Sequence, residues 1–191
     1  QAVAEVARSY AGPQAFAGPV LVVPYTEVVD VAEKDAQGVT RKVPRERSGR
    51  WTFFPRDLVV GGRLRPDIRQ LGLHKVRVYE LQARVDATFD VQLPADPDPS
   101  RPRRIGTPSL GYGIADVRGL VGSPRLRVDG AERAIEQGGP GAPGVHASLP
   151  APRAGSRWRF GSRLELVLGG TESLALVPLG TRNRVRIESP W

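Results

Sequence analysis

The sequence contains no cysteine and no methionine. The absence of cysteine excludes disulfide bonds, thiolate catalysis, iron-sulfur clusters and cysteine-based zinc sites, and it is compatible with both oxidising and reducing compartments. A chain without methionine that opens on Gln1 is expected to be a piece of a longer protein. Histidine is scarce as well: only His74 and His146 occur, with no metal-ligand spacing. We therefore expect no metal site and no cofactor.

Long apolar runs and aromatic residues are also few. The longest uncharged stretch, residues 9–26, is interrupted by two glycines and three prolines, so it is not expected to cross a membrane as a helix. No signal peptide is recognisable in the chain. Aromatic residues make up 6% of the sequence, and Trp51, Phe53, Phe54 and Phe89 fit a core better than an exposed stacking surface. We therefore expect no nucleic-acid binding, despite a net charge of +8.

The positive charge comes almost entirely from arginine, because only three of the 28 basic residues are lysines. Residues 34–75 hold eleven basic residues against four acidic ones, and residues 101–191 hold fourteen against seven. Two interpretations remain open. The arginines reflect a compositional bias and line solvated strand faces, or they form a surface for an anionic partner.

Most apolar residues recur with the period of two that is typical of strands. Residues 79–91 alternate apolar and polar side chains throughout, which predicts a strand with one buried and one solvated face. Asp129-Gly130 predicts a two-residue hairpin turn, and Gly169-Gly170 suggests a second hairpin near the end of the chain. Further strands are predicted at residues 20–25, 28–31, 51–54, 58–64, 126–128, 131–135, 164–168, 174–178 and 184–188. The expected fold is all-β: an antiparallel β-sandwich or barrel-like domain of about ten strands.

The first residues have a different period. Val3, Val6, Ala7 and Tyr10 share one face of a helix, which must end before Gly12-Pro13. This predicts one short N-terminal amphipathic helix. We assign residues 1–15 to a helical stalk and residues 16–191 to a single β-rich domain. Five prolines between residues 94 and 108 predict an exposed loop that cannot pair in a sheet.

No motif for nucleophilic catalysis occurs in the sequence, but one charged pair is notable. Asp116 and Arg118 stand at i and i+2 with apolar neighbours, which places both on one side of a strand. Such a pair is either a structural ion pair or the floor of a pocket.

Several landmarks follow one another in a family-specific order. They are residues 18–25 (GPVLVVPY), Gly72-Leu73, residues 114–120 (IADVRGL), residues 144–147 (GVHA), and a C-terminal pattern that ends at Ser189 and Trp191. With this order the chain resembles the extracytoplasmic domain of the CreD family, inner-membrane proteins linked to cell-envelope integrity in Gram-negative bacteria. Leu71 and Ala115 depart from the usual Arg and Ser, which puts polar roles at those positions in doubt.

The resemblance implies one membrane span before Gln1 and several after Trp191, with this domain on the periplasmic face of the Gram-negative inner membrane. It implies a non-enzymatic role in envelope integrity and stress response, including the response to β-lactams and colicin tolerance. The expected partners are anionic lipid, lipopolysaccharide or an unknown protein. The alternative is an enzyme acting on an envelope glycan or lipid, with Asp116, Arg118 and His146 in one cleft.

This topology carries a geometric expectation. If membrane spans flank both ends, the two ends of the domain must lie on one side. Tyr10 and Trp191 are then expected near the membrane, where amphipathic rings are favoured. Arg182, Arg184 and Arg186 are the expected contacts to an anionic surface, because they lie closest in sequence to the C-terminal span.

Overall fold

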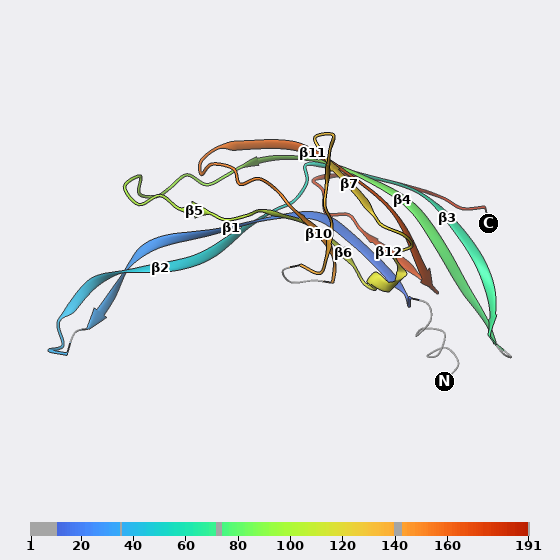
Figure 1. Ribbon diagram of the computed structural model, residues 1–191, viewed down its shortest axis with the longest axis horizontal. Coiled ribbons are helices and arrows are strands. Elements are labelled where there is room, and N and C mark those ends of the chain that lie inside the picture. The colour runs from blue at the N-terminus through green and yellow to red at the C-terminus, as the bar shows by residue number, and fades with distance from the viewer. Residues whose placement is uncertain (1–10, 35, 72–73, 140–142, 191) are drawn as a thin grey trace.

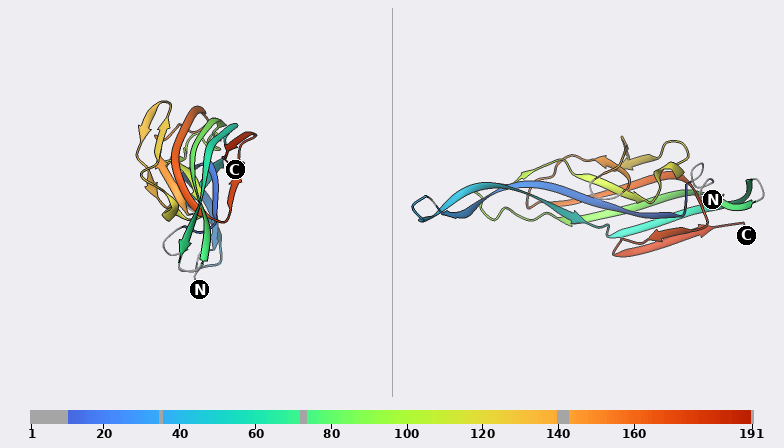
Figure 2. Two further views of the ribbon diagram at one scale, coloured as in Figure 1. Left: turned by 90° about the vertical axis from the view of Figure 1, so that its right-hand side faces the viewer. Right: turned by 90° about the horizontal axis from the view of Figure 1, so that it is seen from below.

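The computed structural model describes residues 11–34, 36–71, 74–139 and 143–190. Within these ranges the chain forms thirteen strands and one short 3₁₀ turn, arranged as two facing sheets (Figures 1 and 2). The all-β, sandwich-like prediction is confirmed, with more strands than the ten expected. The predicted helix over Val3 to Tyr10 lies outside the described residues. In the described part of the chain, no helix is long and apolar enough to cross a membrane.

The first sheet has the strand order β12-β1-β6-β10-β9, with β2 and β5 also paired to β1. Its strands are β1 (Gln14–Lys34), β2 (Thr40–Phe53), β5 (Arg104–Ile105), β6 (Ser109–Ile114), β9 (Glu136–Gln137), β10 (Gly144–Ser148) and β12 (Leu174–Val177). Since β1 begins at Gln14, the last two residues of the range assigned to the stalk belong to this sheet.

The second sheet has the order β13-β3-β4-β11-β7-β8. Its strands are β3 (Asp57–Leu71), β4 (His74–Gln92), β7 (Arg125–Val128), β8 (Ala131–Arg133), β11 (Arg157–Thr171) and β13 (Arg182–Glu188). The turn between β7 and β8 is Asp129-Gly130, with φ of 50° and 80°. These positive values are the ones a two-residue hairpin needs, so this predicted hairpin is confirmed.

The core lies between the two sheets. The alternation predicted for residues 79–91 is present in β4, where Val85, Ala87 and Phe89 are buried. The Phe89 ring stacks on Phe160 of β11 with 4.7 Å between ring centroids. Trp51 and Phe53 pack against this core, as expected, whereas Phe54 is 52% exposed. We call the side of the second sheet that is turned away from the core its outer face.

Strands β1 and β2 form a long arm that extends from the body of the sandwich (Figure 1). The two strands predicted at residues 20–25 and 28–31 are one continuous strand here. At the base of the arm Tyr25 stacks on Trp51, and the Arg103 guanidinium lies 5.2 Å and 5.4 Å from the centres of these two rings. The arm is therefore anchored by aromatic stacking and by cation–π contacts.

The proline-rich loop supplies Arg103 and so helps to fix the arm. Buried Glu27 accepts hydrogen bonds from Arg47 and Arg103, and these, Arg47 first, lower the pKa of the Glu27 carboxyl. Next to it, Arg104–Ile105 pair with Tyr25 and Thr26 of β1. The prediction that residues 94–108 cannot pair was therefore wrong for these two residues, which no proline interrupts.

The end of the chain departs from the predicted hairpin. Gly169-Gly170 lie inside β11, which continues to Thr171. The chain then crosses to the first sheet, where β12 pairs in parallel with β1, and β13 returns to pair in parallel with β3. The second hairpin prediction was wrong, because local spacing does not reveal which strand a segment will pair with.

The start of β1 and the end of β13, which are the first and last strands of the chain, lie toward the same end of the molecule, opposite the tip of the arm (Figures 1 and 2). We call this end the terminal pole. The geometric expectation that both ends of the domain share one side agrees with this arrangement.

Strand register gives the same result. The Gln14 side chain donates to the carbonyl of Gly169, and Gly169 lies level with Arg65 of β3 through their common pairing to β4. At the other end of the chain, Glu188 pairs with Arg63, two residues away from Arg65. Gln14 and Glu188, near the two ends of the described chain, therefore lie at nearly the same level of the second sheet.

Candidate functional site

Asp116 and Arg118 form a closed ion pair at the start of the 3₁₀ turn η1 (Val117–Gly119). One Asp116 carboxylate oxygen, Oδ1, accepts a hydrogen bond from the Arg118 backbone N–H at 3.0 Å, and Oδ2 accepts one from Arg118 Nη2 at 2.6 Å. The Arg118 hydrogen bond keeps the pKa of Asp116 below its ordinary value, although partial burial opposes this. Asp116 is therefore an ionised cap of the turn.

Gln14 holds this turn against both sheets, a role that the sequence reasoning missed. Its side chain is buried, and its amide Nε2 donates to the carbonyls of Asp116 at 2.8 Å and Gly169 at 3.1 Å. Its carbonyl Oε1 accepts from the Asp116 N–H at 3.1 Å. A polar residue at an inward position of an otherwise apolar strand was the available signal, because a buried amide needs partners.

His146 has interaction partners of its own. It lies on β10 in the first sheet, where its Nδ1 is 2.8 Å from the Gly138 carbonyl and its Nε2 is 3.7 Å from Glu136. In the strand register it pairs with Gly111 of β6, five residues before Asp116, and within the described ranges it shares no hydrogen-bond partner with Asp116 or Arg118. Asp116 and Arg118 are thus engaged with each other, and no hydrogen bond or ion pair among the described residues joins His146 to either of them.

Arg182, Arg184 and Arg186 alternate along the edge strand β13 on the outer face of the second sheet. Arg182 is paired with Asp57 at 2.6 Å, and Arg186 with Glu188 at 2.9 Å. Arg184 alone of the three makes no ion pair within the described ranges. Two of these candidate contacts thus already have acidic partners. Tyr10 and Trp191, the candidate membrane-proximal residues, lie outside the described residues.

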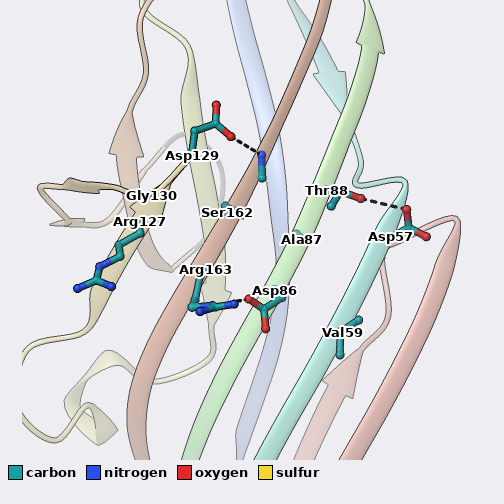
Figure 3. Close-up of a pocket in the computed structure, with 11 residues that line it drawn as sticks. Asp57, Val59, Asp86, Ala87, Thr88, Arg127, Asp129, Gly130, Ser162 and Arg163 are labelled. Carbon is teal, nitrogen blue, oxygen red and sulfur yellow. Dashed lines mark hydrogen bonds and ion pairs between the residues drawn. The ribbon is translucent and has the colours of Figure 1, made fainter.

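A groove of about 410 Å³ crosses the outer face between β3, β4, β11 and β7 (Figure 3). Burial opposes ionisation of Asp86 in this groove, but hydrogen bonds from Arg163 and Arg84 outweigh it and keep the pKa of Asp86 low. Asp57 is held ionised in the same way, by Arg182 first and then by Thr88. Ionised, neutralised carboxylates are poor general acids, so these groups mainly tie neighbouring strands together.

The Asp129 carboxylate of this groove also has a structural role. The Asp129 carboxylate accepts a hydrogen bond from the Gly161 N–H at 2.8 Å, which fixes the β7–β8 turn against β11. Across the residues that the structure describes, no three histidine, aspartate or glutamate side chains gather where a metal ion could be held.

These features define a β-sandwich domain whose acidic groups serve mainly as ion-pair partners and whose first and last strands, β1 and β13, begin and end toward one pole, respectively. The chain belongs to the CreD family, because the family described as "Inner membrane protein CreD" matches residues 1–191. It is 29% identical over 192 residues to the inner membrane protein CreD of Escherichia coli (strain K12), across 97% of this chain and 40% of that relative. The chain thus spans less than half of the relative's length. No solved structure matches it.

Proposed function

We propose that the chain is a non-enzymatic periplasmic module of a multi-spanning inner-membrane protein that supports envelope integrity and stress response. The observation that carries this proposal is the position of the start of β1 and the end of β13 at one pole. Membrane spans on both sides of a domain require this arrangement. In this proposal the terminal pole faces the bilayer and meets anionic envelope lipid, while the arm points into the periplasm. The roles in β-lactam response and colicin tolerance belong to the same proposal.

The arrangement of the charged groups supports a binding role over the enzyme alternative. Asp116 is engaged by Arg118, whereas the His146 Nδ1 lies 2.8 Å from the Gly138 carbonyl. Catalysis by general acid and base requires such groups within hydrogen-bond reach of one reacting atom. No observation favours an activity on glycan or lipid.

The periplasmic location can be tested by labelling. Because the chain has no cysteine, Ser123→Cys places a single thiol on an exposed loop of this domain. In cells that carry the full-length protein and have a permeabilised outer membrane, we expect a membrane-impermeant maleimide to label this thiol. A cytoplasmic thiol protein should stay unlabelled in the same cells. Labelling of Ser123→Cys only after the inner membrane is dissolved would place the domain in the cytoplasm and contradict the proposal.

A further inference from the structure

A second cavity, of about 390 Å³, lies at the terminal pole; we call it the pole pocket. It opens between β3, β4, β11 and the η1 turn. Its apolar surface comes from Pro66, Val78, Val121 and the adjacent glycines of β11, Gly169 and Gly170. Its charged lining is mixed: Arg65, Arg69 and Arg118 are basic, and Asp67 and Glu80 are acidic. A cavity with an apolar lining and a few charged groups is the usual form of a ligand site.

Part of the pocket wall carries no side chains because it is formed by Gly169 and Gly170, and these two positions differ in the room that they leave. An added Cβ at Gly170 would collide with the Tyr79 hydroxyl, so this position is closed to larger residues. At Gly169, by contrast, an added Cβ would make only ordinary contacts, the nearest being the Gly119 carbonyl at 3.5 Å. The space above Gly169 is therefore open to an occupant.

The charges around the pocket favour an anion. Arg69 is paired with Asp67 at 3.0 Å, and Arg118 is engaged by Asp116. Arg65 makes no ion pair within the part of the chain that the structure describes, although Glu80 lies opposite it on β4. An exposed guanidinium with no partner has its planar fork free to bind a phosphate through two hydrogen bonds.

The surroundings of the pocket favour a lipid over a soluble anion. Two of the large exposed apolar side chains lie at this pole: Ile68 on β3 is 53% exposed, and Val121 after η1 is 54% exposed. Apolar side chains beside basic ones are typical of surfaces that rest in the headgroup region of an anionic bilayer. The outer-face groove and β13 also carry exposed apolar side chains, Val59 and Val185, but most of their arginines are already paired.

We propose that the pole pocket binds the phosphate of an anionic glycerophospholipid in the membrane surface. Arg65 holds the phosphate, the ion-paired Arg69 and Arg118 flank it, and the apolar lining around Gly169 covers the glycerol end of the headgroup. This inference rests on the proposed function, since it requires the terminal pole to face the bilayer. It moves the principal lipid contact from Arg182, Arg184 and Arg186 to Arg65.

Co-sedimentation with vesicles tests this assignment. The 191-residue chain is mixed with vesicles of phosphatidylcholine alone, or of equal parts phosphatidylcholine and phosphatidylglycerol, at low and physiological salt. We expect the unmodified chain to prefer the anionic vesicles. Arg65→Glu should weaken this binding roughly tenfold, since it reverses a charge at the lipid surface. Arg184→Glu, the same change at another unpaired arginine of the outer face, should alter it less than about twofold.

A second pair of variants keeps the charge unchanged and also guards against misfolding. Gly169→Leu fills the pocket, whereas Gly61→Leu places the same side chain on the outer face where an added Cβ meets nothing within 4 Å. We expect only Gly169→Leu to remove the preference for anionic vesicles, with both variants melting as cooperatively as the unmodified chain.

The possible failures are distinguishable. If the unmodified chain shows no anionic preference, the lipid contact in the proposed function is wrong. If it does, but Arg65→Glu and Arg184→Glu weaken binding equally, or Gly169→Leu binds normally, the pole pocket is wrong and the contact is a diffuse charge effect. Displacement from the vesicles by sodium phosphate at constant ionic strength would identify a free-anion site and also overturn the assignment.

Discussion

Gly119→Ala is expected to destabilise the domain by about 3 kcal/mol, near the upper end of the usual cost of overpacking a core. An added Cβ at this position would collide with the Gly169 carbonyl and the Gln14 amide nitrogen, and it would lie 3.0 Å from the Ala11 side chain. The carbonyl belongs to a central strand and the amide is held by three hydrogen bonds, so neither can move away cheaply.

Equilibrium urea unfolding measures this effect, and Gly61→Ala is its matched control. At Gly61 an added Cβ meets nothing within 4 Å, so the methyl group should leave stability unchanged or raise it slightly. Equal stabilities of the two variants would mean that η1 does not pack against β11 as described.

Gln14→Leu is expected to cost about 3 kcal/mol or more. The change keeps the size of the side chain but leaves the Asp116 N–H and the carbonyls of Asp116 and Gly169 without their partner. Each buried polar group that loses its hydrogen bond costs about 1–3 kcal/mol, and relaxation of the turn recovers part of the sum.

The control for this change is Gln92→Leu. The Gln92 side chain is exposed, and its amide donates to the Gly155 carbonyl at 2.8 Å, where water can replace it. Its loss should change the free energy of unfolding by no more than about 0.5 kcal/mol. Similar losses for the two glutamine variants in urea unfolding would contradict the bridging role of Gln14.

The parts of the fold that the sequence predicts are those fixed by neighbouring residues. Alternation along residues 79–91 predicted the buried face of β4, and Asp129-Gly130 predicted the β7–β8 turn, because both depend on local geometry. The crossing of β12 to the first sheet was not predictable in this way. Its partner, β1, lies at the other end of the chain, and no local pattern encodes that pairing.

The same distinction applies to the candidate sites. The Asp116–Arg118 ion pair forms, but at a 3₁₀ turn and not along a strand as the spacing of two residues predicted. The role of Gln14 depends on partners 102 and 155 residues away, and the pole pocket depends on the meeting of three strands and a turn. In the sequence Arg65 does not differ from many other arginines of predicted strands. Its lack of an acidic partner can be seen only in three dimensions.

The central claim is that the terminal pole faces the inner membrane and the arm points away from it. Collisional quenching of a fluorophore by nitroxide-labelled phospholipid tests it directly, in the full-length protein reconstituted into bilayers. Because the chain lacks cysteine, Ile68→Cys at the pole and Lys42→Cys on the arm each give one labelling position in this domain. We expect strong quenching at position 68 and almost none at position 42. Equal quenching at both positions, or stronger quenching on the arm, would contradict the account.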